Sequence, residues 1–212
     1  MNRQPARSRI RGLYAIADTT VLAPDQLLPA VQQAIAGGAS VIQFRDKSDN
    51  SVLRLQQAQE LANLCRENNV VYIINDDATL AKAVAADGVH LGRDDPIPAG
   101  VRAFLRPEAL VGVSCYNEIE LARKAKSDGA DYVAFGSFYP SSIKPDAVRA
   151  TTDLLHLASE ELDLPVVAIG GITPENGAEL VAAGADALAV ISGVFAANNI
   201  REAAKRYTRL FD

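Results

Sequence analysis

The sequence is poor in cysteine, methionine and tryptophan, and it lacks long apolar runs. Its 212 residues include two cysteines, one methionine and no tryptophan, and aromatic residues make up 6%. Two cysteines without CxxC spacing exclude a disulfide-rich scaffold and a cysteine-based zinc site, and they favour a reducing compartment. No stretch of about 18 apolar residues occurs, so we expect no membrane-spanning helix and no membrane partner.

Basic residues are outnumbered, since 26 acidic side chains against 21 basic ones give a net charge of −5. This balance argues against a nucleic-acid partner. The only basic run is N-terminal and contains Arg3, Arg7, Arg9 and Arg11. No apolar segment of the kind found in a secretory signal follows it. We therefore expect residues 1–11 to form a flexible basic tail and the protein to be cytoplasmic. The sequence leaves the oligomeric state open and allows a homo-oligomer.

Eight short apolar runs recur along the chain, with starts about 25 residues apart on average. Each is apolar at consecutive positions, which is typical of strands buried on both faces of a parallel sheet. The predicted strands cover residues 13–17, 41–44, 70–74, 88–91, 110–114, 132–135, 166–169 and 187–191.

Apolar residues at helical spacing fill the intervals between these runs. The predicted helices cover residues 25–37, 51–67, 78–86, 97–106, 117–128, 148–162, 175–184 and 193–210. Glycine stands shortly before a strand at Gly38, Gly88, Gly129 and Gly184, where it would end the preceding helix in the left-handed conformation. The uninterrupted series predicts an α/β fold, a single (β/α)8 TIM barrel with parallel strands over residues 12–212. An open doubly wound sheet is the alternative, although no GxGxxG motif follows the first strand.

Polar residues gather at the carboxyl ends of the predicted strands, where barrel enzymes carry their active sites. Asp76 and Asp95 follow the third and fourth strands. Two neighbouring carboxylates repel each other unless a proton or cation lies between them, and oxygen ligands suit Mg²⁺. The alternative is a set of solvated loop carboxylates, or helix caps at Asp77 and Asp94.

Two further groups at this rim favour phosphate binding. Arg45, Lys47 and Lys144 could bind a diphosphate together with Mg²⁺, or could instead pair with the acidic residues. The glycine-rich segments 170–173 and 191–193 follow the last two strands and could cup one monophosphate, or could simply be tight turns. Both phosphate sites together suit an enzyme that joins a pyrophosphate ester to a phosphomonoester.

His90 lies within the fourth predicted strand, and we interpret it as a hydrogen-bonded core histidine rather than a catalytic one. No Ser-His-Asp, Cys-His or zinc motif accompanies it.

The chain resembles the thiamine phosphate synthase family from Tyr14 to about Phe195. The ordered motifs YAIAD, QFRDK, NDD, DGVHLGRDD, GVS, YPSSIKP, IGGIT and VISG carry the resemblance. It implies a (β/α)8 barrel and a transferase that joins 4-amino-2-methyl-5-pyrimidinylmethyl diphosphate to 4-methyl-5-(2-phosphoethyl)thiazole. The products are thiamine phosphate and pyrophosphate, formed by a dissociative, carbocation-like substitution.

The resemblance also implies a role for each matching residue. Asp76 and Asp95 would bind Mg²⁺. The residues implied for the pyrimidine diphosphate are Gln43, Phe44, Arg45, Asp46, Lys47, Asn75, Ser114 and Lys144, and the catalytic residues among them are Arg45, Lys47, Ser114 and Lys144. The residues implied for the thiazole phosphate are Ser141, Ser142, Ile143, Gly171, Ile191 and Ser192.

One position departs from the family pattern. The loop that usually reads PTxTK reads Pro140-Ser141-Ser142-Ile143-Lys144 here, so Ile143 lacks a hydroxyl. Three rival functions stay open: a thiazole tautomerase-like paralogue, a non-catalytic binder of thiamine precursors, and an unrelated phosphate-sugar isomerase. The first would not need paired metal carboxylates, the second would show no Mg²⁺-dependent turnover, and the third would need a placed acid–base pair.

Overall fold

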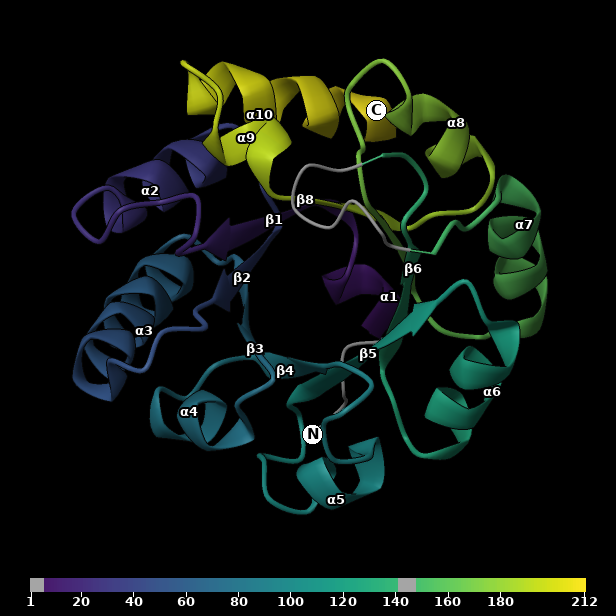
Figure 1. Ribbon diagram of the computed structural model, residues 1–212, viewed down its shortest axis with the longest axis horizontal. Helices are drawn as coiled ribbons and strands as arrows, with labels where there is room; N and C mark the ends of the chain where they lie inside the picture. The colour runs from purple at the N-terminus through teal and green to yellow at the C-terminus, as the bar shows by residue number, and fades with distance from the viewer. Residues whose placement is uncertain (1–5, 141–147) are drawn as a thin grey trace.

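Eight parallel strands pair in sequence order in the computed structural model, and the last pairs with the first to close a barrel (Figure 1). The structure describes residues 6–140 and 148–212. The strands are β1 (Gly12–Asp18), β2 (Val41–Arg45), β3 (Val71–Asn75), β4 (Gly88–Leu91), β5 (Leu110–Tyr116), β6 (Tyr132–Gly136), β7 (Val166–Ile169) and β8 (Ala187–Val190). The predicted TIM barrel is confirmed, and the open doubly wound alternative is excluded.

Helices surround the strands as an outer ring (Figure 1). The ring contains α2 (Leu27–Ala36), α3 (Ser51–Glu67), α4 (Ala78–Ala83), α5 (Pro98–Arg102), α6 (Ile119–Ser127), α7 (Thr152–Glu161), α8 (Gly177–Ala182), α9 (Ser192–Phe195) and α10 (Ile200–Thr208). The single helix predicted over 193–210 is split, because Asn199 Oδ1 accepts a hydrogen bond from the amide of Glu202 at 3.1 Å and starts α10 there. Within the described ranges, no helix has the length and apolar character needed to cross a bilayer.

The consecutive apolar residues of each strand supply two separate buried layers. In β1, Leu13, Ala15 and Ala17 join the layer between strands and helices, whereas Tyr14 and Ile16 join the cluster inside the barrel. Successive side chains of a strand point to opposite faces. Because both faces are covered here, neither can be polar over most of the strand.

The glycine pattern before the strands is confirmed at three of its four positions. Gly38, Gly129 and Gly184 follow α2, α6 and α8 with φ of 97°, 90° and 107°, a conformation that favours glycine. The fourth position differs: after α4 it is Ala85 that adopts a positive φ of 51°. Gly88 instead lies in β4, where an added Cβ would strike the backbone of Leu110.

The first described residues close the amino-terminal end of the barrel. Residues Ala6–Arg9 form a short helix, α1, which lies within the ring of strands in Figure 1. Ile10 is 0% exposed and packs in the interior cluster with residues from the starts of several strands. Arg9 Nη2 lies 2.7 Å from Asp87 Oδ1. Ile10 thus supplies an apolar plug at this end of the barrel; the flexible tail expected for residues 1–11 stays a prediction, and residues 1–5 lie outside the described part.

Candidate active site

Strand alternation builds the site in layers. On β2, Val41 lies in the interior cluster, and Gln43 and Arg45 follow at every second position toward the carboxyl end. Above the interior cluster a cavity of about 410 Å³ opens. Its lining includes Tyr14, Gln43, Arg45, Asn75, His90, Ser114, Gly171, Ile191 and Ser192. The structure thus brings seven of the predicted substrate residues (Gln43, Arg45, Asn75, Ser114, Gly171, Ile191 and Ser192) to one cavity.

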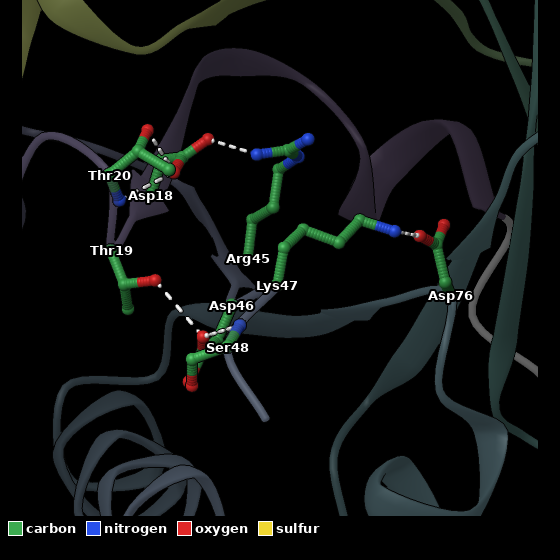
Figure 2. Close-up of polar contacts among 8 residues, drawn as sticks. All are labelled: Asp18, Thr19, Thr20, Arg45, Asp46, Lys47, Ser48 and Asp76. Atoms are coloured by element: carbon green, nitrogen blue, oxygen red, sulfur yellow. Dashed lines mark hydrogen bonds and ion pairs between the residues drawn. The ribbon is translucent and has the colours of Figure 1, made fainter. Parts of the chain in front are cut away.

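Arg45 is held in place by a carboxylate that the sequence analysis did not assign to the site. Its Nη1 lies 2.5 Å from Oδ2 of Asp18, the last residue of β1 (Figure 2). The other oxygen of Asp18 accepts hydrogen bonds from the amide and hydroxyl of Thr20 at 2.9 and 2.7 Å. Asp18 pairs with Arg45 in the ladder between β1 and β2, so their closeness was foreseeable once the strands were aligned.

Lys47 and two carboxyl groups form the second part of the rim. Lys47 Nζ donates to Asp76 Oδ2 (Figure 2), and the carboxyls of Asp76 and Asp95 are close enough to influence each other's protonation. Burial raises the pKa of Asp95, and the adjacent Asp76 adds to the rise although the Gly92 amide opposes it. Burial also works to raise the pKa of Asp76, but the hydrogen bond and charge of Lys47 outweigh it and the pKa is lowered.

This pair of carboxyls fits a magnesium ion. Two neighbouring carboxylates repel each other unless a proton or a cation lies between them. Among the described residues, no three His, Cys, Asp or Glu side chains converge on one point. Mg²⁺ commonly uses one or two protein carboxylates and completes its octahedron with substrate phosphates and water. The carboxyls of Asp76 and Asp95 could therefore supply two of the oxygen ligands of a Mg²⁺ ion.

Two residues of the QFRDK segment point elsewhere. The Phe44 side chain is buried in the layer between strands and helices. Figure 2 shows Asp46 turned away from Arg45 and Lys47. Its carboxylate accepts hydrogen bonds from Thr19 Oγ1 at 3.1 Å and from the amide of Ser48 at 2.7 Å. Asp46 thus braces the loop that carries Lys47.

The glycine-rich loops form the opposite wall of the cavity. Gly171 has a φ of 64°, and an added Cβ would overlap the carbonyl oxygens of Tyr139 and Pro140. Only glycine fits there, and no backbone acceptor for its amide N–H is found among the described residues. Ile191 and Ser192 complete this wall from the end of β8. Ser141, Ser142, Ile143 and Lys144 lie outside the described residues.

His90 is a hydrogen-bonded core residue, as interpreted from the sequence, although it also reaches the cavity. It is 8% exposed; its Nδ1 lies 3.1 Å from the Tyr132 hydroxyl and its Nε2 lies 2.9 Å from Ser114 Oγ. Burial lowers the pKa of His90 to about 4, against a smaller opposing effect of Asp76. Sequence reasoning missed Tyr14 and Tyr132, because a tyrosine inside an apolar run gives no signal of which face it occupies.

The two cysteines take no part in the site. Both are buried and unpaired. Burial raises the pKa of the Cys65 and Cys115 thiols to about 12, which keeps them unreactive.

Comparison with known proteins agrees with this geometry. Residues 13–194 match the thiamine monophosphate synthase family. Thiamine-phosphate synthases from Thiobacillus denitrificans and Nitrosococcus oceani are 53% and 49% identical, over 94% and 96% of this chain and 94% of each relative. A thiamine phosphate pyrophosphorylase from Pyrococcus furiosus is 33% identical, with a TM-score of 0.86 over 96% of both chains. The chain therefore belongs to the thiamine monophosphate synthase family.

Proposed function

We propose that the barrel rim joins 4-amino-2-methyl-5-pyrimidinylmethyl diphosphate to 4-methyl-5-(2-phosphoethyl)thiazole, forming thiamine phosphate and releasing pyrophosphate. Membership in the family makes the chain a transferase of thiamine phosphate synthesis. One observation carries the assignment of the two substrates to the site. The cavity has the Arg45 guanidinium on one wall and a glycine-rich loop on another, and an adjacent hollow lined by Lys47 and Asp76 shares Asn75 with it.

The cationic wall is suited to the diphosphate. Arg45 offers a planar fork of N–H donors, Lys47 a compact positive charge and Ser114 a hydroxyl, all of which match phosphate oxygens. Asp76 and Asp95 would hold Mg²⁺, whose charge would stabilise the leaving pyrophosphate. Once the diphosphate and the ion are bound, Lys47 is free to move its hydrogen bond from Asp76 to a phosphate oxygen. Asn75 lines both the cavity and the adjacent hollow that contains Lys47 and Asp76, and it can donate from its amide. Lys144, outside the described residues, would add a further positive charge.

The reaction needs no nucleophilic side chain. The bond between the pyrimidine methylene carbon and the diphosphate oxygen breaks first, and its electron pair leaves with pyrophosphate. The thiazole nitrogen then donates its lone pair to the resulting carbocation, and a carbon–nitrogen bond forms. Arg45, Lys47 and Ser114 stabilise the negative charge that develops on the leaving group. The cavity walls hold the two reacting atoms together and limit access of water to the cation.

The glycine-rich wall is suited to the phosphate of the thiazole substrate. Without a side chain at Gly171, a phosphate oxygen can approach its amide closely, since that amide has no backbone acceptor in the described part of the chain, and the Ser192 hydroxyl lies on the same wall. Ser141, Ser142 and Ile143, outside the described residues, would border the thiazole ring. We place the reaction in the cytoplasm, where two unpaired buried cysteines are stable.

The test is a product assay with purified protein. Both substrates are supplied with and without Mg²⁺, and thiamine phosphate and pyrophosphate are measured together. We expect both products in equal amounts, only with metal, and none from an Arg45→Ala variant. Isomerisation of the thiazole alone would favour the tautomerase-like rival. Binding of both substrates without turnover by folded protein would favour the non-catalytic binder.

A further inference from the structure

A continuous line of hydrogen bonds crosses the floor of the cavity through five strands. Gln43 Nε2 donates to the Tyr14 hydroxyl at 2.9 Å, and Tyr14 and Tyr132 share a hydrogen bond of 2.9 Å. Tyr132 then meets His90 Nδ1 at 3.1 Å, and His90 Nε2 meets Ser114 Oγ at 2.9 Å. Gln43 and Ser114, the two ends of the line, both line the cavity.

The direction of the first two hydrogen bonds follows from the amide of Gln43. An amide nitrogen can only donate, so Tyr14 accepts from Gln43. Tyr14 is 1% exposed and has no other hydrogen-bond partner in the described ranges than Gln43 and Tyr132. A buried hydroxyl without an acceptor is costly. Tyr14 therefore donates its proton to Tyr132.

The same reasoning fixes the remaining protons. Tyr132 is 0% exposed and already accepts from Tyr14, so its own proton goes to His90 Nδ1. An imidazole that accepts at Nδ1 is neutral and carries its hydrogen on Nε2. His90 Nε2 therefore donates to Ser114 Oγ, and the Ser114 proton is left to point into the cavity.

We propose that Tyr14, Tyr132 and His90 are positioning residues that fix the hydrogen-bond polarity of the cavity, with an acceptor at Gln43 and a donor at Ser114. Because Gln43 Nε2 is bound to Tyr14, the Oε1 oxygen of the same amide is the atom turned toward the ligand. No hydrogen bond to this oxygen is found among the described residues. Ser114, whose oxygen accepts from His90, presents its proton to a ligand oxygen or ring nitrogen.

This polarity selects one class of ring. On the substrate of the proposed function, the exocyclic amine of the pyrimidine would donate to Gln43 Oε1. A 4-oxo group in the same place would bring two acceptor oxygens together, and a site built around one hydrogen bond strongly rejects the analogue that cannot make it. The inference rests on the proposed function for the identity of the ring, but the direction of the hydrogen bonds does not.

The sequence provides space for this arrangement at Gly112. An added Cβ on Gly112 would overlap the ring of Tyr132, so only glycine on β5 lets this tyrosine lie across the interior. The rings of Tyr132 and His90 pack at 5.5 Å between centroids, and those of Tyr14 and Tyr132 at 6.2 Å. The orientation of the line is therefore held by packing as well as by hydrogen bonds.

The direction of these hydrogen bonds is measured by ¹⁵N NMR of histidine-labelled protein without ligands, because the spectrum shows which ring nitrogen of His90 carries the hydrogen. The chain has two histidines, and the exposed His156 on α7 can be replaced by glutamine to leave the His90 signals alone. We expect a neutral ring with its hydrogen on Nε2. A ring protonated on Nδ1, or on both nitrogens at neutral pH, would overturn the proposal.

The consequence for selectivity is measured with the 4-amino and 4-oxo pyrimidine diphosphates. In Tyr14→Phe the Gln43 amide loses its anchor and can turn over, so we expect the preference for the amino substrate in kcat/KM to fall about tenfold. Tyr72→Phe is the matched control, because Tyr72 is equally buried and donates to the Ala58 carbonyl at 3.1 Å away from the cavity.

An unchanged preference in Tyr14→Phe would remove the positioning role, and so would an equal loss of preference in Tyr72→Phe. Failure of the wild-type protein to use either substrate would refute the proposed function. In that case the histidine signals would still decide the direction of the hydrogen bonds.

Discussion

The carboxylate of Asp18 holds the guanidinium of Arg45 at 2.5 Å while being itself only 1% exposed. Both oxygens of Asp18 are occupied, one by Arg45 and the other by Thr20. The arginine is therefore oriented before any ligand arrives, and little reorganisation is needed when negative charge develops beside it.

Replacing Asp18 by asparagine should lower both the catalytic efficiency and the stability of the protein. Arg45 would lose its charged partner and its fixed direction, so we expect kcat/KM for the diphosphate substrate to fall about 10- to 100-fold. The free energy of unfolding should fall by about 1–3 kcal/mol, because a partly buried guanidinium loses its compensating charge. Steady-state kinetics and urea unfolding measure the two effects.

A matched control is the Arg93–Glu118 pair, whose groups are 3.0 Å apart but well exposed. Glu118→Gln should change stability by less than about 0.5 kcal/mol, as is usual for surface ion pairs. If Asp18→Asn left the kinetics at wild-type values, Asp18 would have no positioning role.

The two carboxyls of the rim should control the metal requirement. Asp76→Asn and Asp95→Asn each remove one of the two proposed metal ligands, so the Mg²⁺ concentration for half-maximal activity should rise at least about tenfold. Asp77→Asn is the control: Asp77 Oδ1 caps α4 by accepting from Leu80 at 2.8 Å, and asparagine keeps that cap. A metal titration curve unaffected by Asp76→Asn would remove Asp76 from the metal site.

Burial of His90 should make stability depend on pH. Its pKa of about 4 in the folded protein lies below the ordinary value of 6.5, so the unfolded chain takes up the proton more readily. The contribution of His90 is complete above about pH 6.5, and about 2 kcal/mol of it is lost by pH 5, with the remainder lost down to about pH 4.

Urea unfolding in metal-free buffer measures this contribution as the difference between wild type and His90→Gln, in which the effects of the carboxylates largely cancel. The difference should shrink as the pH falls, because only the wild type carries the histidine. His156→Gln changes an exposed residue, so its free energy of unfolding should depend on pH as that of the wild type does. A difference independent of pH between about 7 and 5 would contradict the assignment of a strongly lowered pKa.

Two glycines should respond in opposite ways to alanine. At Gly112 the new methyl would overlap the Tyr132 ring, and overpacking of this kind costs about 1–3 kcal/mol. At Gly100 in α5 nothing lies within 4 Å of the new methyl, and alanine in a helix is favoured over glycine by up to about 1 kcal/mol. Thermal unfolding measures the stability of both variants, and an equal change in Tm for Gly112→Ala and Gly100→Ala would contradict the packing described for Tyr132.

The fold was predictable because its signals are local. The helix predicted over 51–67 matches α3 at both ends, and Asn50 caps its first turn by accepting from the amide of Leu53 at 3.1 Å. The closure of the barrel by Ile10 was not predictable, because an arginine-rich segment normally lies in solvent. Its one buried residue gains its partners only after the strands have assembled.

The candidate site was predictable as a set of loops but not as a set of side chains. The QFRDK segment was assigned to the pyrimidine diphosphate as a whole, although alternation along β2 turns Phe44 into the layer under the helices and Asp46 in the following loop turns away from Arg45 and Lys47. Asp18 and Tyr14 lie in a strand whose register with β2 determines their partners. A sequence motif identifies the ligands of a family, but the residues that orient those ligands depend on which strands become neighbours.

The plug formed by Ile10 affects how substrates reach the cavity and how products leave it. With the amino end filled by apolar side chains, the described residues leave the cavity open toward the carboxyl-terminal rim. Both substrates and both products would then share this opening among the described residues. A ring seated on Gln43, deep in the wall, has to enter before anything occupies the rim above it, and the joined product has to wait until the pyrophosphate has gone. An ordered binding of the substrates and an ordered release of the products would thus follow from the closed amino-terminal end of the barrel.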